Sequence, residues 1–428
     1  MGTLFCCRLS TLRGEVRIPT SKSHTIRAVA IASLAAGESR VRHPLESADT
    51  AAAVRVYRAL GAEIEQKRDV WLVRGTGGEL IPPDDVLDVG NSGTTMRIVL
   101  GSCALLRSGA AVITGDEQSR RRPCGPLLNS LNDLGARAFS TRENGLAPFV
   151  VQGRLAGGKT AIEAHTSQYL TSLLLCAPLA DGESVIDVPV LNEQPYVEMT
   201  LDWIRRQGIE LEQEDLRRFR IAGGQEYQPF DRAVPADFSS ATFFLAAGAL
   251  GANDITACGL DMDDPQGDKA VVDYLRQMGA QVEIEGKKIR VRPGDLRGTE
   301  LDLNNTPDAL PMMAVLGCFA RGTTRLVNVP QARIKESDRI AVMCSELSKM
   351  GARVEELEDG LVVHESKLKG TRVSGHGDHR VVMALAVAGL ASPGETVIDT
   401  AEAVSVTFPT FAQSMIALGA NMDVRQEI

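Results

Sequence analysis

Apolar helices and amphipathic helices alternate along this chain. The segments 241–250 (ATFFLAAGAL) and 381–390 (VVMALAVAGL) are apolar nearly all round, which predicts helices buried on every side. The segment 268–278 instead carries its apolar residues on one face, as expected for a helix that covers a core. Segments of alternating polarity such as 282–291 predict β-hairpins with one face in water. The pattern indicates an α/β protein with helices inside and sheets outside.

Two glycine positions recur with a period of about 72 residues. The first follows an amphipathic helix and precedes a strand: Gly61, Gly135, Gly208, Gly279, Gly351 and Gly419. The second follows an apolar helix: Gly37, Gly109, Gly182, Gly251, Gly322 and Gly394. Glycine is favoured just past a helix because it adopts the left-handed conformation without steric cost. Six copies of both positions predict six repeats of helix, strand, helix and hairpin.

The sixth repeat is incomplete at its C-terminal end. It stops after one strand, 420–424, and its hairpin is missing. The segments 4–9 and 14–18 have the pattern of two strands, so we infer that the start of the chain completes the last repeat. One domain is then discontinuous.

Equivalent positions three repeats apart predict where the chain crosses between two domains. Pro19 precedes the first apolar helix and Pro235 precedes the fourth. We therefore expect a two-domain, inside-out α/β barrel architecture with three repeats in each domain. The domains are residues 20–235 and residues 1–19 plus 236–428. Two linkers between domains favour a hinge, and we expect the active site in the cleft that the hinge closes.

Charge and cysteine content narrow the class of protein. The net charge of -9 argues against a protein that binds nucleic acids. The eight cysteines form no C-x-x-C pair, and several lie in apolar helical segments, which is typical of reduced core residues. No segment has the pattern of a signal peptide or a membrane span. We expect a cytoplasmic monomer that holds no metal and contacts neither nucleic acid nor membrane.

The apolar helices begin with small polar residues or glycine. Their starts are 21–24, 91–94, 166–168, 237–240, 306–308 and 377–380. Helix N-termini attract anions because their first N–H groups are unpaired. Helix capping alone explains these polar starts, but not the four cations beside buried helices, since a buried charge needs a partner. These cations are Lys22, Arg27, Arg97 and Arg380. Together they predict a binding site for a strongly anionic ligand.

Two further segments concentrate positive charge. One is residues 120–122, three arginines before Pro123. The other is 333–339, in which Lys335 and Arg339 lie four residues apart and would share a helix face. Such side chains suit carboxylate and phosphate groups. A solvated loop and a network of surface ion pairs are the alternatives.

Three carboxylates stand beside these cations: Asp308, Glu336 and Asp378. A carboxylate near cations is a candidate for proton transfer, while helix capping and ion pairing are the alternatives. The chain has no H-E-x-x-H, G-x-S-x-G or Walker A pattern. Metal hydrolysis, serine hydrolysis and P-loop chemistry are therefore unsupported.

Eight motifs, taken together, are specific to one known family. They are Ser21-Lys22-Ser23-x-x-x-Arg27, Gly90-Asn91-Ser92-Gly93-Thr94-x-x-Arg97, Arg122-Pro123, Ser167-Gln168, Gln266-Gly267-Asp268, Pro307-Asp308, Arg333-x-Lys335-Glu336-x-Asp338-Arg339 and Asp378-His379-Arg380. With them the chain resembles the 5-enolpyruvylshikimate-3-phosphate (EPSP) synthase family over essentially its whole length. The resemblance implies two domains, each with three βαβαββ units around buried helices.

The resemblance also implies an activity, that of a transferase in the shikimate pathway to chorismate and the aromatic amino acids. Family members transfer the enolpyruvyl group of phosphoenolpyruvate to the 5-hydroxyl of shikimate 3-phosphate. They release phosphate through a tetrahedral addition–elimination intermediate and use no metal or organic cofactor. The resemblance implies a target of glyphosate, because Gly93 keeps open a pocket that alanine would narrow.

The match between the motifs of this chain and those of the family also implies which residues form the site. The catalytic residues would be Asp308, as base toward the attacking hydroxyl, with Glu336 and Lys22 as the proton relay to the methylene carbon. Those implied to bind shikimate 3-phosphate are Lys22, Ser23, Arg27, Thr166, Ser167, Gln168, Tyr196, Asp308, Gln331 and Lys335. Those implied to bind phosphoenolpyruvate are Lys22, Gly93, Thr94, Arg122, Gln168, Glu336, Arg339, Asp378 and Arg380.

Four positions depart from the family pattern. Thr166 replaces a serine and keeps the hydroxyl, Gln331 replaces an asparagine and keeps the amide, and Val406 replaces a lysine. Glu193 replaces a serine that contacts the substrate phosphate, which a glutamate would repel. We expect either that Asn192 takes the place of that serine or that Glu193 turns away.

Two alternatives to this activity stay open. UDP-N-acetylglucosamine enolpyruvyl transferases share the fold, but they carry a reactive cysteine where this chain has Glu117 and Lys-Asn where it has Lys22-Ser23. The first alternative is a divergent enolpyruvyl transferase that acts on another hydroxylated acceptor, such as UDP-N-acetylglucosamine. The second is a non-catalytic anion-binding paralogue. The presence of both Asp308 and Glu336 argues against the paralogue, because binding alone needs neither.

Overall fold

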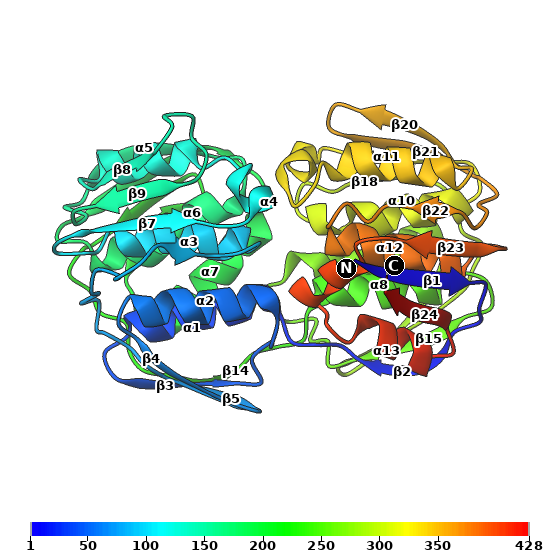
Figure 1. Ribbon diagram of the computed structural model, residues 1–428, viewed down its shortest axis with the longest axis horizontal. Coiled ribbons are helices and arrows are strands. Elements are labelled where there is room, and N and C mark those ends of the chain that lie inside the picture. The colour runs from blue at the N-terminus through cyan, green and yellow to red at the C-terminus, as the bar shows by residue number, and fades with distance from the viewer. Residues whose placement is uncertain (1, 427–428) are drawn as a thin grey trace. The chain divides into compact units, whose positions relative to one another are not determined.

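The described residues form six four-stranded sheets with the same strand order, and Figure 1 shows their strands together with the helices. The structure is a computed structural model that describes residues 2–426. Numbered along the repeat, the first strand of each sheet runs parallel to the second. The fourth strand lies between the second and the third and is antiparallel to both. For example, β10 (Gly158–Ala164) runs parallel to β11 (Ser184–Leu191), while β13 (Arg218–Ile221) is antiparallel to β11 and to β12 (Leu211–Glu214). The repeating unit is βαβαββ, as the family resemblance implies.

The described residues divide into two compact units. The continuous unit runs from Thr20 to Val234. The discontinuous unit joins the segment that ends at Pro19 to the segment that starts at Pro235. The chain therefore passes between the units twice. Nowhere in the described part is a helix long and apolar enough to cross a membrane.

The continuous unit contains the first three repeats. Its helices within the described residues are α1 (Lys22–Leu34), α2 (Ala48–Ala59), α3 (Gly93–Cys103), α4 (Glu117–Arg120), α5 (Gly125–Asp133), α6 (Ser167–Cys176), η1 (Ala177–Leu179) and α7 (Gln194–Arg206). Its strands are β3 (Glu38–Arg42), β4 (Glu63–Lys67), β5 (Val70–Arg74), β6 (Leu87–Asp88), β7 (Ala110–Thr114), β8 (Arg137–Ser140), β9 (Phe149–Gln152), the strands β10 to β13 whose bounds are given above, and β14 (Asp231–Ala233).

The discontinuous unit contains the other three repeats. Its helices within the described residues are α8 (Phe238–Gly248), η2 (Gly267–Ala270), α9 (Val271–Met278), η3 (Pro307–Ala309), α10 (Leu310–Phe319), η4 (Pro330–Ile334), α11 (Arg339–Lys349), α12 (His379–Leu390), η5 (Ala401–Val406) and α13 (Phe411–Ala417). Its strands are β1 (Thr3–Arg8), β2 (Arg13–Arg17), β15 (Asp254–Cys258), β16 (Gln281–Glu285), β17 (Lys288–Arg292), β18 (Glu300–Asp302), β19 (Thr323–Val327), β20 (Arg353–Leu357), β21 (Gly360–His364), β22 (Arg372–Val373), β23 (Glu395–Ile398) and β24 (Asn421–Gln426).

The start of the chain contributes to two repeats. β1 lies between β23 and β24 and is antiparallel to both, so it closes the sheet of the sixth repeat as expected. β2 instead runs parallel to β15 and opens the sheet of the fourth repeat. The expectation that both strands complete the sixth repeat is therefore wrong. The first repeat takes its opening strand from β14, which runs parallel to β3 just before the second passage between units.

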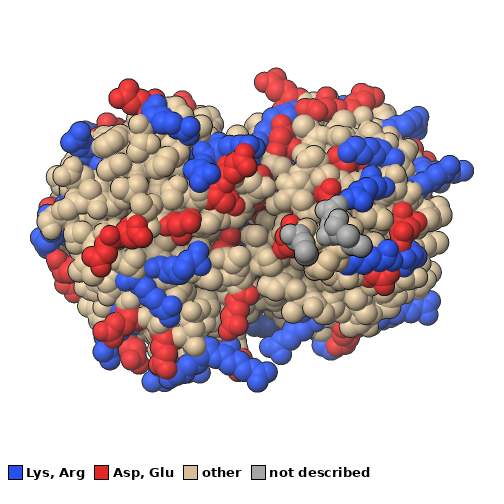
Figure 2. All heavy atoms as spheres, in the orientation of Figure 1, with Lys and Arg blue, Asp and Glu red and all other residues tan. Residues whose placement is uncertain are grey.

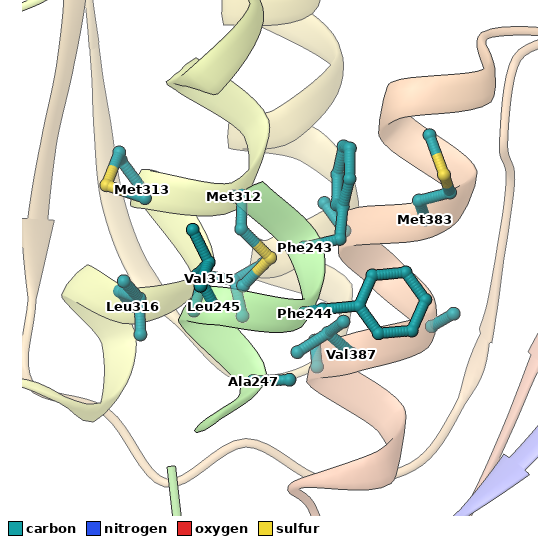
Figure 3. Close-up of a cluster of buried hydrophobic side chains, with 14 of the residues drawn as sticks. Phe243, Phe244, Leu245, Ala247, Met312, Met313, Val315, Leu316, Met383 and Val387 are labelled. Carbon is teal, nitrogen blue, oxygen red and sulfur yellow. The ribbon is translucent and has the colours of Figure 1, made fainter. Parts of the chain in front are cut away.

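Three apolar helices form the core of each unit. In α3, α8 and α12 every residue is buried. Phe243 and Phe244 of α8 pack in one cluster with Met312 of α10 and with Met383 and Val387 of α12 (Figure 3). A helix without a polar face is stable only where other elements cover it all round. The amphipathic helices and the sheets provide this cover, which confirms the inside-out arrangement.

The glycines that follow amphipathic helices end them as predicted, but those that follow apolar helices lie three to six residues beyond the helix and do not cap it. All six that follow amphipathic helices are left-handed, with φ between 74° and 105°. Five of the six that follow apolar helices are left-handed too, and Gly182 is the exception. A Cβ at Gly182 would lie 2.7 Å from the carbonyl oxygen of Ala156, so this glycine is explained by close approach of the chain.

Charged side chains of both signs are interspersed on the face shown in Figure 2. Many form surface pairs, such as Arg290 with Asp254 at 2.6 Å. Pairs of this kind contribute little to stability because water screens them. Five arginines that the sequence marks as candidates for anion binding are instead buried: Arg27, Arg97, Arg122, Arg339 and Arg380. A buried cation needs partners, so the question for these five arginines is what each one contacts.

Candidate active site

A buried arginine at the start of α11 gathers three carboxylates. The Arg339 guanidinium donates to Asp378 Oδ2 at 2.8 Å, to Asp308 Oδ1 at 2.7 Å and to Glu336 Oε2 at 2.6 Å. Arg380 adds a second cation, with Nη2 at 2.8 Å from Asp308 Oδ2. We call these five residues the Arg339 cluster. It brings together all three carboxylates that the sequence marked for proton transfer.

The charges in the Arg339 cluster fix its protonation. Burial alone would raise the pKa of Asp308, but Arg380 and Arg339 outweigh burial and hold this pKa well below its usual range. Burial also opposes ionisation of Asp378, and Arg339 again lowers the pKa of that carboxyl below its ordinary value. Burial would lower the pKa of Arg339, yet its carboxylate partners raise it above its ordinary value. At neutral pH Asp308, Asp378 and Arg339 are therefore ionised.

Helix starts position the Arg339 cluster. Asp378 caps α12 by accepting from the Arg380 N–H at 2.9 Å, and it also accepts from Ser337 Oγ at 3.0 Å. Asp308 lies in η3, directly before α10, and Ser239 Oγ of α8 donates to it at 3.5 Å. The first turns of α8 and α12 and the η3 turn before α10 therefore converge on one group of charges. The polar starts of the apolar helices predicted that these starts lie together, and within this unit they do.

The segment before α11 differs from the sequence prediction. Lys335 follows η4 in an extended conformation, with φ -85° and ψ -150°, and α11 begins only at Arg339. The expectation that Lys335 and Arg339 share a helix face is therefore wrong. Lys335 still lies close enough to Asp308 to help the two arginines lower its pKa against the effect of burial. Gln331 is buried in η4, and its Nε2 donates to the carbonyl of Asn304 at 2.8 Å.

In the continuous unit, Arg27 is buried and contacts only neutral acceptors among its described hydrogen bonds. They are Ser23 O at 3.0 Å, Tyr196 O at 3.1 Å, Thr200 Oγ1 at 2.9 Å and Thr171 Oγ1 at 3.3 Å. Burial lowers the pKa of Arg27 to about 10, so the side chain keeps its charge at neutral pH. A buried cation held by neutral groups is ready to stabilise an anion brought near it.

Lys22 and Ser23 open α1 beside Arg27. Lys22 Nζ lies 3.1 Å from Asp49 Oδ2, a buried carboxylate of α2. The pair places a lysine at a helix start, where the first N–H groups already favour an anion. Lys22 therefore has an internal counter-ion in this structure, which the sequence did not reveal.

Gly93 lies against two guanidinium groups at the start of α3. A Cβ built there would be 2.4 Å from Arg122 Nη1 and 2.8 Å from Arg97 Nη1. Arg97 in turn donates to Gln168 Oε1 at 2.9 Å, and Gln168 Nε2 donates to Thr94 Oγ1 at 3.1 Å. We call these five residues the Gly93 cluster. Two close cations at a helix N-terminus favour an anion, so this cluster is a candidate binding group.

The three arginines before Pro123 have different surroundings. Arg120 and Arg121 are exposed, and Arg121 pairs with Glu117 on the same helix turn. Arg122 is buried, and its Nη2 lies 3.4 Å from Asn91 Oδ1. The alternative of a solvated loop therefore holds for the first two arginines and not for the third.

Glu193 does not turn away from the start of α6, so that expectation is wrong. Its side chain is 1% exposed, and Oε2 accepts from Thr166 Oγ1 at 3.1 Å, from Ser167 N at 3.0 Å and from Ser167 Oγ at 2.7 Å. Asn192 donates to the carbonyl of His165 at 3.2 Å. A carboxylate of the protein thus binds where the resemblance implies a substrate phosphate.

A family model, EPSP synthase (3-phosphoshikimate 1-carboxyvinyltransferase), matches residues 8–415. The chain belongs to this family. A 3-phosphoshikimate 1-carboxyvinyltransferase of Acetivibrio thermocellus is 55% identical, over 97% of this chain and 98% of that protein. The enzyme of the same name from Ruminiclostridium cellulolyticum is 50% identical over the same shares. The structure of the EPSP synthase of Acinetobacter baumannii superimposes with a TM-score of 0.83 at 27% identity and covers all of both chains.

The motifs did not mark two of the contact residues, Asp49 and Ser239. Arg97 was predicted as a cation beside a buried helix, but no ligand was assigned to it. Asp49 and Ser239 meet their partners across different elements, and no local pattern marks such contacts. Within residues 2–426, no group of three or more His, Cys, Asp and Glu side chains could hold a metal ion.

Proposed function

We propose that this chain transfers the enolpyruvyl group of phosphoenolpyruvate to the 5-hydroxyl of shikimate 3-phosphate and releases inorganic phosphate. The observation that carries the proposal is the Arg339 cluster in a chain of the EPSP synthase family. Two fixed guanidinium groups suit carboxylate and phosphate ligands, and carboxylates beside them can move protons. Relatives over nearly the whole chain are named 3-phosphoshikimate 1-carboxyvinyltransferases.

Addition comes first in the reaction. A proton moves to the methylene carbon of phosphoenolpyruvate and makes it a methyl group, with Glu336 and Lys22 as the relay. The neighbouring carbon becomes electrophilic, and the 5-hydroxyl oxygen of the acceptor attacks it while Asp308 accepts the hydroxyl proton. The product of this step is a tetrahedral intermediate that still carries the phosphate.

Elimination then restores the double bond. The relay takes a proton back from the methyl group, the carbon–oxygen bond to phosphate breaks, and phosphate leaves with the electron pair. Charge on the departing phosphate is stabilised by fixed guanidinium groups and helix N-termini. Positioning and electrostatics supply the catalysis, so the protein needs to hold its charges still rather than form a covalent bond.

The ion pairs of Asp308 explain how it becomes a useful base. Arg380 and Arg339 outweigh burial and keep the pKa of Asp308 so low that the carboxylate is a weak base. The carboxylate of phosphoenolpyruvate, bound by these arginines, would neutralise part of their charge. The pKa of Asp308 would then rise toward the range in which general-base catalysis is efficient.

The continuous unit supplies the remaining binding groups in this proposal. The Gly93 cluster would bind the phosphate of phosphoenolpyruvate, because two guanidinium groups approach a helix start that lacks a Cβ. Lys22, Ser23 and Arg27 would bind shikimate 3-phosphate beside the start of α1. Since Asp308 and Glu336 belong to the other unit, the proposed reaction needs residues of both units. We also propose that the enzyme acts as a cytoplasmic monomer, which gel filtration and cell fractionation would test.

Phosphate release tests the proposed function. The purified chain is mixed with phosphoenolpyruvate and with shikimate 3-phosphate, UDP-N-acetylglucosamine or no acceptor. Phosphate release that occurs only when shikimate 3-phosphate is the acceptor supports the proposal. Release only with the nucleotide sugar would assign the chain to the other acceptor, and release with neither would leave an anion-binding protein.

A further inference from the structure

The start of α6 is an anion-binding pocket that a protein carboxylate already fills. Glu193 Oε2 receives three hydrogen bonds there, from one backbone N–H and from the hydroxyls of Thr166 and Ser167. Thr166 stands at the N-cap position without a capping side-chain bond of its own. A helix N-terminus favours negative charge. Glu193 therefore provides the carboxylate that this helix start binds.

The backbone holds Glu193 in this position. The residue is left-handed, with φ 59° and ψ 41°, at the N-cap of α7. On one side the Asn192 N–H donates to Ala164 O at 3.1 Å, and on the other the Tyr196 N–H donates to Glu193 O at 3.0 Å. The conformation is unusual for a residue with a side chain, so the surrounding hydrogen bonds direct this carboxylate into the pocket.

Glu193 also offsets the positive charge around the pocket. Burial lowers the pKa of Arg27 to about 10, and Tyr196 and Glu193 act against that effect. The carboxylate is thus within electrostatic reach of the arginine expected to bind the acceptor. A phosphate group entering the pocket would meet the same donors, the same arginine and a competing negative charge.

We propose that Glu193 competes with the phosphate group of the acceptor for the Thr166 and Ser167 donors, and so sets how strongly the enzyme prefers a phosphorylated acceptor. The inference rests on the proposed function and concerns the specificity of that same site. A phosphate oxygen within hydrogen-bond reach of Ser167 would lie beside the carboxylate, and the two like charges would repel. Phosphate binding therefore requires Glu193 to leave. A neutral acceptor hydroxyl could instead donate to the carboxylate and leave it in place.

Two variants test the competition. Glu193→Ser restores a small hydroxyl, and Glu193→Gln removes the charge at nearly constant volume. Both are expected to lower KM for shikimate 3-phosphate about tenfold or more. The reason is that the charge-assisted hydrogen bonds from Thr166 and Ser167 to Glu193 no longer have to break before the phosphate group binds. The ratio of kcat/KM for shikimate 3-phosphate to kcat/KM for shikimate should rise by a similar factor. A merely structural glutamate would not improve binding when removed.

Glu198 offers the matched control. It is an exposed glutamate on the same helix, so Glu198→Gln and Glu198→Ser make the same changes of charge and size away from the pocket. These controls should leave both KM values as in the wild type. If the Glu193 variants keep the wild-type KM and acceptor ratio, the competition does not exist and the inference is overturned.

A measurement on the wild type protects the test against variants that fail to fold. Calorimetry of the unmodified chain should show that shikimate 3-phosphate binds less than about a hundredfold more tightly than shikimate, since displacing Glu193 cancels much of the gain from phosphate. A larger ratio would overturn the inference. An absence of wild-type turnover with shikimate 3-phosphate would instead overturn the proposed function, so the two failures can be told apart.

Discussion

At the scale of single residues, small differences decide the chemistry of the candidate site. Gly93 lets two guanidinium groups approach a helix start that any Cβ would obstruct. Asp308 bridges Arg339 and Arg380, and burial alone would not leave it ionised. Glu193 accepts hydrogen bonds from Ser167 N and Oγ, donors that we propose the acceptor phosphate also uses. Each role follows from what one side chain contacts.

The first prediction concerns Gly93. Gly93→Ala would place a Cβ 2.4 Å from Arg122 Nη1, so the guanidinium must move and the space proposed for phosphoenolpyruvate shrinks. We expect inhibition by the anionic analogue glyphosate to weaken about tenfold or more, the equivalent of losing one charge-assisted hydrogen bond. Inhibition curves at fixed phosphoenolpyruvate measure the effect.

Gly125 provides the control for this substitution. It is the first residue of α5, three residues after Arg122, and a Cβ there would meet nothing within 4 Å. Gly125→Ala should leave inhibition unchanged. Equal inhibition of the wild type and Gly93→Ala would show that the pocket is assigned to the wrong residues.

The sequence predicted most of these residues but not how they are paired. Motifs placed Asp308, Glu336 and Arg339 in one site because their spacing is family-specific, and the structure brings their side chains within hydrogen-bond distance. The orientation of Glu193 could not be predicted, because it depends on a left-handed backbone at a position where the family has serine. The Lys22–Asp49 pair joins two helices and leaves no local signal.

At the scale of elements, helix starts and strand partners determine where the site residues lie. The hydrophobic period and the glycine positions predicted the repeats, because both follow from local helix and strand geometry. Strand partners are not local. β2 has the pattern of a strand, but its pairing with β15 depends on which sheet lacks an edge strand in the folded chain. The sequence therefore predicted the repeats better than the exchange of strands between them.

The second prediction concerns Asp378, which caps α12 and binds Arg339. Burial opposes its ionisation, but Arg339 lowers its pKa below the unfolded value of about 3.9. A carboxyl with a lowered folded-state pKa stabilises the fold at pH above the unfolded pKa and loses this contribution as pH falls through the folded value. We expect Asp378→Asn to lower the free energy of unfolding by about 3–5 kcal/mol at pH 7, because Arg339 loses a buried partner.

Denaturant unfolding between pH 7 and pH 3 measures this effect. The difference between the wild type and Asp378→Asn should be constant down to about pH 4 and shrink below it. Asp295→Asn removes an exposed carboxylate in the same unit and should change little. A difference between the wild type and Asp378→Asn that grows as pH falls would contradict the assigned pairing.

At the scale of the whole molecule, the site residues are divided between two units that the chain connects twice. Lys22, Arg27 and the Gly93 cluster lie in the continuous unit, and the Arg339 cluster lies in the discontinuous one. The proposed reaction needs residues of both. A double connection allows the units to rotate about a hinge without separating.

The third prediction is therefore a change of shape on ligand binding. Small-angle scattering should give a smaller radius of gyration with shikimate 3-phosphate than without it. Arg27→Ala, which removes a cation proposed to bind the acceptor, should weaken the response to the ligand. Identical profiles of the wild type with and without saturating ligand would count against a hinge.

The central claim is the reaction itself, and phosphate release with and without Asp308 tests it most directly. The wild type should release one phosphate per phosphoenolpyruvate consumed when shikimate 3-phosphate is present, and none with UDP-N-acetylglucosamine. Asp308→Asn should reduce kcat by about 10²–10⁴-fold, the usual contribution of a general base. No release by the wild type, or full activity in Asp308→Asn, would contradict the account.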